Sequence, residues 1–327
     1  MAKKKIKKIL VTGSVGQIGS ELTMALRAKY GNDNVVAAGN RTKPSDLLKN
    51  SGPFEWVDVT DVVKLVEVVR RYSIDTIVNM SALLSAVGEK NPQMCWHVNV
   101  NGLINTLEVA RILELQQVLC PSSIAVWGDY APLENTPQET VLKPRTMYGV
   151  TKVTGELLCD YYFRRFGIDA RGLRYPGIIS AETLPGGGTT DYAVWIYYKA
   201  VEEKKYECFV REDTRLPMMY MPDCLKATMD LMEADISTLK HHGDFNVGSM
   251  SFSAGELAAE IRKHIPEFTV TYKPDHRQQI ADSWPNSVDD SSARAEWGWK
   301  PSYSIGSMTE DMLENLRKRH KKGKLYA

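Results

Sequence analysis

The feature that most constrains the fold of this chain is the alternation, through its first half, of short apolar runs with amphipathic segments of helical length. Such alternation is typical of βαβ units, whose strands form a parallel sheet. We predict strands at 9–11, 35–38, 76–80 and 118–120 and one ending near residue 175, with helices at 17–30, 63–71, 91–113 and 148–166. The pattern therefore predicts an α/β fold with a doubly wound parallel sheet.

The alternation stops after residue 177. The segment 185–188 (Pro-Gly-Gly-Gly) indicates a flexible loop, and a helix is predicted at 191–201. A chain of 327 residues is long enough for a large domain and a smaller lobe, since single hydrophobic cores stop growing at roughly 250–300 residues. We predict a first domain over 1–176 and a smaller C-terminal α/β lobe over 177–327, with some segments of the lobe returning to the first domain.

Charge and composition argue against several kinds of partner. The 41 basic and 40 acidic side chains nearly balance, so the overall charge does not favour a nucleic acid. The basic run that includes Lys3, Lys4 and Lys5 has no aromatic residues among it and is interpreted as a solvated tail. No stretch approaches the roughly 20 apolar residues that span a membrane, and a strand beginning by about residue 6 leaves no room for a presequence in this sequence. Five scattered cysteines without a C-x-x-C spacing argue against a disulfide framework or a zinc site, and no metal is predicted.

A glycine-rich segment lies between the first predicted strand and the first predicted helix. It reads Thr12-Gly13-Ser14-Val15-Gly16-Gln17-Ile18-Gly19, with the spacing G-x-x-G-x-x-G. At such a place backbone N–H groups and the helix dipole can hold a pyrophosphate, and glycines allow its close approach. The alternative is a plain tight turn, but the position at the first strand-to-helix junction favours a dinucleotide site.

The end of the second predicted strand bears on which dinucleotide binds. An acidic residue there usually accepts the ribose hydroxyls of NAD, but this chain reads Ala38-Gly39-Asn40-Arg41. Asn40 can bond a ribose hydroxyl and Arg41 can meet a 2′-phosphate, so the residues alone leave NAD and NADP open. Asp58 and Val59, after the next strand-like run, stand where an adenine contact is usual, and a turn aspartate is the alternative for Asp58.

Tyr148 and Lys152 are four residues apart in a predicted helix, so their side chains lie on one face. A phenol with an ordinary pKa near about 10 is not a base at neutral pH unless a neighbouring cation stabilises its phenolate. Lys152 supplies that cation. A Tyr-x-x-x-Lys spacing is common by chance, and its place after a phosphate loop and a serine-rich strand end is what predicts a catalytic acid/base pair.

Two serines follow the strand predicted at 118–120. Ser122 and Ser123 fall at the C-terminal edge of the sheet, where ligands bind in such folds. A hydroxyl there can bond the reacting oxygen and polarise a carbonyl. We predict Ser123 as the third catalytic residue, with Ser122 as the alternative and a turn or capping hydroxyl as the other interpretation of either serine.

Together these motifs resemble one protein family. The glycine loop, the Ser-Ser-x-x-x-x-Gly strand end, the Tyr148/Lys152 pair and Arg174-Tyr175-Pro176-Gly177 resemble the extended short-chain dehydrogenases of the NAD-dependent epimerase/dehydratase type. Two further stretches, 185–194 (Pro-Gly-Gly-Gly-Thr-Thr-Asp-Tyr-Ala-Val) and 283–291 (Ser-Trp-Pro-Asn-Ser-Val-Asp-Asp-Ser), are similar to the short-chain L-threonine 3-dehydrogenases. The resemblance implies a Rossmann-type fold and NAD as the cofactor. It also implies a homodimer paired through the helices at 91–113 and 148–166, and a mitochondrial location in a eukaryote or a cytoplasmic one in a bacterium.

The resemblance further implies a reaction, a step of threonine catabolism. NAD would oxidise the β-hydroxyl of L-threonine to give 2-amino-3-oxobutanoate and NADH, with Tyr148 taking the hydroxyl proton and Lys152 also holding the nicotinamide ribose. The implied amino-acid contacts are Ser85, Ser123, Tyr148, Thr189, Thr190 and Trp284, although Thr189 could instead be a helix-start hydroxyl and Trp284 a packing aromatic. The positions implied beside the cofactor are Gly13, Val15, Gly16, Gln17, Ile18, Gly19, Asn40, Arg41, Asp58, Val59, Met80, Ser81, Ala82, Asn99, Tyr148, Lys152, Tyr175, Gly177 and Ile178.

Two other functions are compatible with the same motifs. A nucleotide-sugar epimerase or dehydratase shares the cofactor loop and the Ser/Tyr/Lys group, and it would need cations such as Arg211, Arg215 or Arg277 for the sugar diphosphate. A non-catalytic sensor of the nicotinamide cofactor is the other alternative, but such proteins often lose the tyrosine or the lysine, and both are present here. The threonine-type stretches favour the dehydrogenase.

Overall fold

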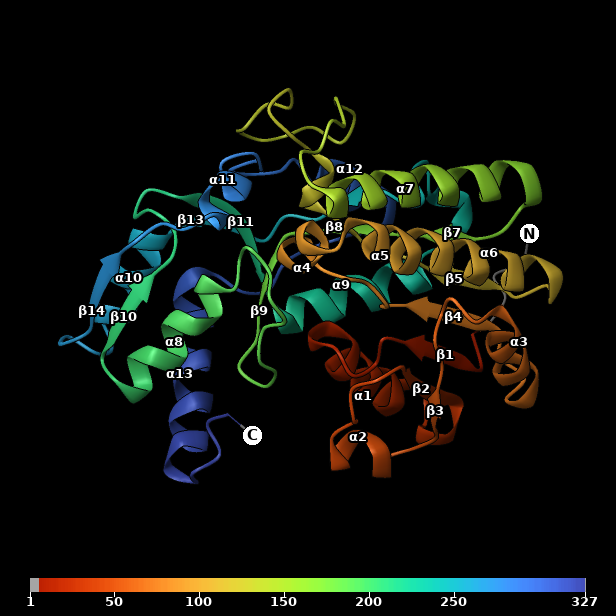
Figure 1. Cartoon of the computed structure of the whole chain (residues 1–327), viewed down its shortest axis with the longest axis horizontal. Helices are drawn as coiled ribbons and strands as arrows, with labels where there is room; N and C mark the ends of the chain where they lie inside the picture. The colour runs from red at the N-terminus through yellow and green to blue at the C-terminus, as the bar shows by residue number, and fades with distance from the viewer. Residues whose placement is uncertain (1–5, 327) are drawn as a thin grey trace.

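The central layer of the molecule is a six-stranded parallel sheet. The computed structural model describes residues 6–326, so Lys3, Lys4 and Lys5, interpreted above as a solvated tail, lie outside the described residues. The sheet has the order β3-β2-β1-β4-β5-β7 (Figure 1) and consists of β1 (Ile9–Thr12), β2 (Val35–Gly39), β3 (Phe54–Trp56), β4 (Thr76–Asn79), β5 (Gln117–Leu119) and β7 (Ala170–Arg171). The strand order reverses between β1 and β4, which is where a doubly wound sheet opens a crevice for a ligand.

Helices cover both faces of this sheet because successive strand side chains point to opposite faces and both sets are apolar. On one face lie α3 (Val62–Arg71), α6 (Gly102–Ile112) and α7 (Met147–Phe166), over Leu10, Val36, Ile77 and Val118. On the other lie α1 (Gln17–Tyr30) and α9 (Met221–Glu233), over Ile9, Val11, Val35 and Val78. The short η1 (Asn32–Asn34) and α2 (Asp46–Asn50) lie in the connections around β2.

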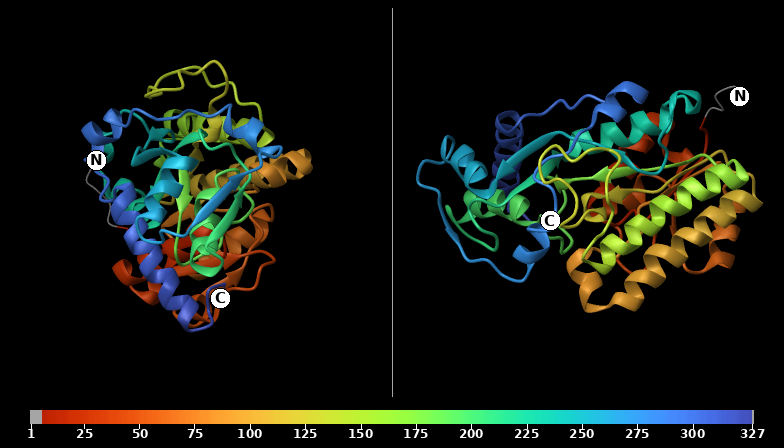
Figure 2. Two further views of the ribbon diagram at one scale, coloured as in Figure 1. Left: turned by 90° about the vertical axis from the view of Figure 1, so that its left-hand side faces the viewer. Right: turned by 90° about the horizontal axis from the view of Figure 1, so that it is seen from above.

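The segment predicted as one helix at 91–113 is helical but not uniformly α-helical. It consists of α5 (Pro92–Trp96), the π-turn η2 (His97–Asn101) and α6, and it runs beside α7 in both Figure 1 and Figure 2. A separate short helix, α4 (Ser85–Lys90), precedes it. Hydrophobic periodicity detects the apolar stripe but not a single wide turn within it, so the prediction missed the π-turn.

A smaller lobe is built from residues after 177 (Figure 1, left). Its helices are α8 (Tyr192–Glu202), α10 (Ala254–Arg262), α11 (Arg277–Ala281) and α13 (Ile305–Lys321), and its strands are β9 (Gly177–Ile179), β10 (Lys205–Cys208), β11 (Arg215–Tyr220), β13 (Met250–Ser253) and β14 (Thr269–Tyr272). β11 pairs with β9 and β13, and β10 pairs with β14. The core of the lobe buries Tyr197, Met308 and Leu316 from α8 and α13.

A third small sheet joins the two parts of the molecule. It has the order β12-β8-β6, formed by β6 (Ser122–Ser123), β8 (Leu173–Tyr175) and β12 (Phe245–Asn246). The 3-10 turns η3 (Ile124–Val126) and η4 (Ile236–Thr238) follow β6 and α9. Phe245 of β12 and Ala293 of α12 (Ser291–Trp297) share a buried cluster with Ile9 of β1, so chain segments from beyond residue 177 pack on the first sheet.

The described part of the chain contributes three further observations. No helix within residues 6–326 is both long enough and apolar enough to cross a bilayer. Its five cysteines are buried free thiols. No group of three or more histidine, cysteine, aspartate or glutamate side chains in the same span is arranged to hold a metal ion.

Candidate active site

The glycine-rich loop between β1 and α1 is closed so tightly that Gly13 and Gly19 have no room for a side chain. Gly13 has a φ of +66°, and a Cβ there would lie 2.6 Å from the carbonyl carbon of Met80. A Cβ on Gly19 would lie 2.2 Å from the carbonyl oxygen of Gly13. Gly16 is the N-cap of α1, where free N–H groups and the helix dipole favour an anion. The loop is therefore a backbone cradle suited to a phosphate group.

The side chains of this loop extend in different directions. Val15 covers the end of β2, where a Cβ on Gly39 would lie 3.1 Å from Val15 Cγ1. Gln17 and Ile18 line a cavity of about 460 Å³, described below, and Gln17 Nε2 is buried without a hydrogen-bond partner among residues 6–326. Because a buried donor without an acceptor is costly, this amide fits a site where a bound molecule supplies the acceptor.

The acid that β2 lacks is supplied by the segment after β3. Asn40 Nδ2 donates to Asp58 Oδ2 at 2.7 Å, and the N–H and hydroxyl of Thr60 donate to Asp58 Oδ1 at 2.9 and 2.7 Å. Burial acts to raise the pKa of Asp58, but these hydrogen bonds and the charge of Arg41 outweigh it and leave that pKa below its ordinary value. Val59 packs on α6, where its carbonyl accepts from Asn105 at 3.0 Å.

Asn99, in the π-turn, holds the segment that follows β4. Its Oδ1 accepts from the Leu83 N–H at 2.8 Å, and its Nδ2 donates to the Leu83 carbonyl at 3.1 Å. The same Nδ2 lies 3.0 Å from Thr151 Oγ1 on α7. Asn99 thus connects the segment that follows β4 to α7, the helix that carries Tyr148.

Helix α7 presents Tyr148 and Lys152 on one face, as their spacing predicts. Thr146 caps the helix by accepting from the Gly149 N–H at 3.0 Å. Lys152 Nζ lies 5.5 Å from the centre of the Tyr148 ring and donates to the Pro121 carbonyl at 2.6 Å. The ammonium is therefore held beside the phenol by a backbone acceptor from the end of β5.

The two serines of β6 have different partners, because neighbouring strand residues face opposite ways. Ser122 is buried, and its hydroxyl donates to Glu156 Oε1 at 2.5 Å. Ser123 Oγ accepts from the Ala125 N–H at 3.2 Å, which leaves the proton of the Ser123 hydroxyl for another acceptor. Of the two serines, Ser123 is thus the one with a donor to spare.

The opposite wall of the site is made by α4 and the loop before α8. Ser85 Oγ and Thr189 Oγ1 are 3.2 Å apart and buried. Asp191 Oδ2 accepts from the Gly187 and Gly188 N–H groups at 2.9 and 2.8 Å. Burial raises the pKa of Asp191 to about 6, against the effect of those two hydrogen bonds. The Asp191 carboxylate thus fixes the conformation of the 185–188 loop.

The connection between the two lobes carries the other predicted contacts. A Cβ on Gly177 would lie 2.9 Å from Thr190 Cβ, so this glycine lets β9 approach the loop. Tyr175 is buried, and its hydroxyl lies 2.5 Å from Thr228 Oγ1. Trp284 is 6% exposed and follows α11.

A cavity of about 460 Å³ joins these parts. It extends from the phosphate loop past α7 to the loop before α8. Lys152 and Asp191 are the charged residues in its lining. Of the sequence-predicted residues, its walls contain Gly13, Gly16, Gln17, Ile18, Gly19, Met80, Ala82, Ser85, Ser123 and its alternative Ser122, Tyr148, Lys152, Tyr175, Gly177, Ile178, Thr189, Thr190 and Trp284.

Seven predicted positions lie off this wall. Ser81 and Asn99 border a separate cavity of about 30 Å³ behind Lys152, and the rest lie near or beyond the end of β2: Val15, Asn40, Arg41, Asp58 and Val59. The structure also brings in Asn79 and Asp191, which the sequence reasoning did not select. Asn79 ends β4, and its Oδ1 accepts from the Thr12 hydroxyl at 2.8 Å. Its place at a strand end beside the first glycine was the available signal.

Comparisons of the sequence and of the structure with known proteins agree on the relatives of this chain. The sequence model of the NAD-dependent epimerase/dehydratase family matches residues 9–248. The solved L-threonine dehydrogenase of Clostridium difficile is 52% identical, with a TM-score of 0.94 over 97% of this chain and 99% of that one. A monomeric L-threonine 3-dehydrogenase from a metagenome is 50% identical, with a TM-score of 0.91 over 95% of this chain and 99% of that one. An uncharacterized epimerase/dehydratase of Staphylococcus haemolyticus is 48% identical over 96% of this chain and 99% of its own length.

Proposed function

The chain belongs to the NAD-dependent epimerase/dehydratase family. We propose that it oxidises the β-hydroxyl of L-threonine with NAD, giving 2-amino-3-oxobutanoate and NADH. The observation that carries the proposal is the cavity that connects the phosphate loop to Ser123, Tyr148 and Lys152, and beyond them to the buried Ser85–Thr189 pair. Solved relatives about half identical to the chain are L-threonine dehydrogenases, which supports the choice of substrate.

The cofactor would be held by the backbone of the glycine loop, by Gln17 and by Lys152. The Cβ-free cradle at Gly13 and Gly19 and the unpaired Gln17 amide fit a dinucleotide. The family match supports NAD as the dinucleotide, and the Asn40–Asp58 pair offers polar groups for its ribose hydroxyls. When bound, NAD supplies the hydride acceptor.

The protein side chains then manage the proton. Tyr148 accepts the proton of the substrate hydroxyl, and the adjacent Lys152 ammonium stabilises the phenolate. Ser123 donates to the reacting oxygen and orients it. Ser85, Thr189, Thr190 and Trp284 form the wall that contacts the amino acid, in the part of the cavity away from the phosphate loop.

The direct test is NADH formation at 340 nm with purified protein, NAD and L-threonine, run beside NADP, L-allo-threonine, L-serine and UDP-galactose. We expect selective NADH formation with L-threonine and NAD. Tyr148→Phe should lower kcat about 1,000-fold, because the base is lost, whereas Tyr130→Phe, at a tyrosine that is 70% exposed and outside the cavity lining, should not change it. Full activity in Tyr148→Phe would show the catalytic assignment to be wrong, whereas NAD binding without any turnover by the wild type would favour the cofactor sensor.

The pH dependence of kcat gives an independent test. The rate should rise with pH, because the catalytic base has to be free of its proton before it can take one from the substrate, and Lys152→Ala should nearly abolish the rate. A flat profile from mildly acidic to alkaline pH, with chemistry shown to be rate-limiting, would contradict a phenolate base.

The nucleotide-sugar alternative is weakened by the arginines it would need. Each is neutralised by an acid, at 2.7 Å for Arg211–Asp282, 2.5 Å for Arg215–Glu256 and 2.6 Å for Arg277–Asp275. None of the three arginines lines the cavity that extends from the phosphate loop to the loop before α8. Measurable epimerisation of UDP-galactose would nevertheless overturn the assignment to L-threonine.

We also propose that the protein forms a homodimer through the paired helices α5–α6 and α7. Leu157 is 64% exposed and Tyr161 54% exposed on α7, and Trp96 and Ile112 are exposed on the neighbouring helix. Light scattering should give twice the 36.8 kDa chain mass, and Leu157→Glu should reduce it to one. A monomeric wild type, as in the metagenome relative, would reject this assembly.

A further inference from the structure

One turn beyond Lys152 on the same face of α7 lies a carboxylate that the proposed reaction does not use. Glu156 follows Lys152 by four residues and Tyr148 by eight, so it continues the same stripe of the helix. The Glu156 side chain is almost fully buried. Oε1 accepts from Ser122 at 2.5 Å and from Arg174 Nε at 2.9 Å, and Oε2 accepts from Arg174 Nη2 at 2.8 Å.

These partners form one transverse row of the small sheet. Ser122 of β6 is in register with Arg174 of β8, which is in register with Asn246 of β12. Arg174 Nη1 donates to Asn246 Oδ1 at 3.1 Å. The adjacent row pairs Ser123 with Tyr175, and both of these line the cavity. The first row therefore builds a buried network that reaches the cavity at Ser122, and the next row borders the cavity at both Ser123 and Tyr175.

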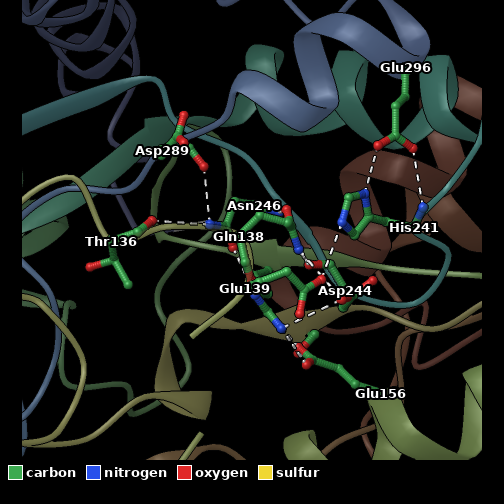
Figure 3. A network of polar contacts seen from close by, with 11 residues as sticks. Thr136, Gln138, Glu139, Glu156, His241, Asp244, Asn246, Asp289 and Glu296 are labelled. Carbon is green, nitrogen blue, oxygen red and sulfur yellow. Dashed lines mark hydrogen bonds and ion pairs between the residues drawn. The ribbon is translucent and has the colours of Figure 1, made fainter. Parts of the chain in front are cut away.

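The network continues into segments distant in sequence, which Figure 3 shows surrounding Glu156 and Asn246. Asn246 Nδ2 donates to the carbonyls of Thr136 and Asp289 at 3.2 and 3.0 Å. Asp244 Oδ2 lies 3.7 Å from Arg174 Nη2. The loop before α7 and the segment before α12 thus meet at Asn246, whose Oδ1 accepts from the buried Arg174.

The consequence for the site follows from the chain around Ser122. The residue before it, Pro121, gives the carbonyl that accepts from Lys152, and the residue after it, Ser123, faces the cavity. Holding the Ser122 side chain fixes both neighbours. A buried ion pair is in itself a weak source of stability, because desolvation offsets the attraction, so the arrangement is better explained by what it positions.

We propose that Glu156 is a positioning residue: through Ser122 and Arg174 it fixes the 121–123 segment, so that Pro121 holds the Lys152 ammonium beside Tyr148 and Ser123 faces the substrate. This inference rests on the proposed function for its kinetic consequence. Its geometric content, an ordered 121–123 segment, can be measured without turnover.

The kinetic experiment compares Glu156→Gln and Ser122→Ala with the control Thr154→Ala. Gln keeps the shape of Glu156 but places an amide donor against an Arg174 donor, whichever way the amide lies. Thr154 donates its hydroxyl to the Val150 carbonyl at 2.9 Å, outside the network. We expect kcat to fall about 30-fold in Glu156→Gln and about 5-fold in Ser122→Ala, with KM for NAD within about twofold of wild type. The pH of half-maximal rate should rise by about half a unit or more in both, because Lys152 is less well held.

A merely structural role would lower the amount of active enzyme without moving the pH profile. Profiles that superimpose on that of wild type, in folded Ser122→Ala and Glu156→Gln, would overturn the proposal. If Glu156→Gln does not fold, Ser122→Ala decides alone, since it deletes one hydroxyl and leaves the ion pair intact.

Hydrogen–deuterium exchange of the segment 120–126 separates this inference from the proposed function. Faster exchange in Ser122→Ala and Glu156→Gln, but not in Thr154→Ala, is expected even if L-threonine is not the substrate. Unchanged exchange in both network variants would reject the positioning role whatever the substrate is.

Discussion

The two walls of the cavity present different chemical groups. The wall at the β1–α1 loop is backbone: Gly13 and Gly19 leave no room for a Cβ, and the groups offered to a ligand are N–H groups at a helix end. The wall formed by α4 and the loop before α8 is side chain: the hydroxyls of Ser85 and Thr189 and the carboxylate of Asp191 make its contacts.

The two walls should therefore differ in how well they tolerate amino-acid substitutions. A backbone cradle recognises a group common to all dinucleotides, and almost any substitution at its close contacts alters its shape. A wall of hydroxyls is recognised by position and can be replaced one group at a time, at about 1 kcal/mol for each hydrogen bond. We therefore expect the response to mutation to be abrupt on the first wall and graded on the second.

The largest effect is expected from Gly19→Ala. The new Cβ would lie 2.2 Å from the Gly13 carbonyl oxygen, so the loop has to open, and we expect NAD binding to weaken more than 100-fold or stability to fall by more than about 3 kcal/mol. Gly16→Ala is the control, because its Cβ would be 3.4 Å from the same oxygen. Calorimetric titration with NAD and urea unfolding measure both quantities, and a graded loss at Gly19 would break the comparison.

A smaller effect, dependent on pH, is expected from Asp191→Asn. Burial raises the pKa of Asp191 from 3.8 to about 6 in the folded state, so the folded protein holds this proton more tightly than the unfolded chain does. The free energy of unfolding that this proton contributes is fully present below about pH 3.8 and is lost as pH rises through about 6. Asn does not ionise, and its oxygen can still accept from Gly187 and Gly188. At pH 8 the variant should have a free energy of unfolding about 2–3 kcal/mol above wild type, and the difference should shrink at pH 5. An equal difference at both pH values would contradict this.

The smallest effect is expected from Thr189→Val and Ser85→Ala. Each removes one hydroxyl of a buried pair, so KM for L-threonine should rise about 5- to 10-fold, or about 1 kcal/mol, with NAD affinity unchanged. The double variant should cost less than the sum of the two, because the hydroxyls share one contact. Strict additivity in steady-state kinetics would mean that the two hydroxyls act separately.

What the sequence could predict was what local rules determine. The glycine loop depends on one strand-to-helix turn, and the Tyr148/Lys152 face depends on four-residue helical spacing, so both were placed from the chain alone. The parallel sheet followed from its apolar runs, and the structure confirms it.

What it could not predict depends on pairing between distant segments. Asn40 meets Asp58 only because β3 pairs with β2, so the chain seemed to lack an acid at this place. The Ser122–Glu156 bond spans 34 residues and depends on α7 packing against β6. Neither contact leaves a periodic signal in the sequence.

The π-turn η2 has a consequence for anyone who would rebuild this protein by exchanging parts. A π-turn accommodates one residue more than the regular helix does over the same span, so α5, η2 and α6 behave as an indivisible module. Deleting one residue between His97 and Asn101 would regularise the helix and leave α5 and α6 close to their present relative orientation, because the wide turn only absorbs the extra residue. A transplanted regular α-helix with the same number of residues would instead rotate α5 by about 100° relative to α6 and carry Asn99 away from Leu83.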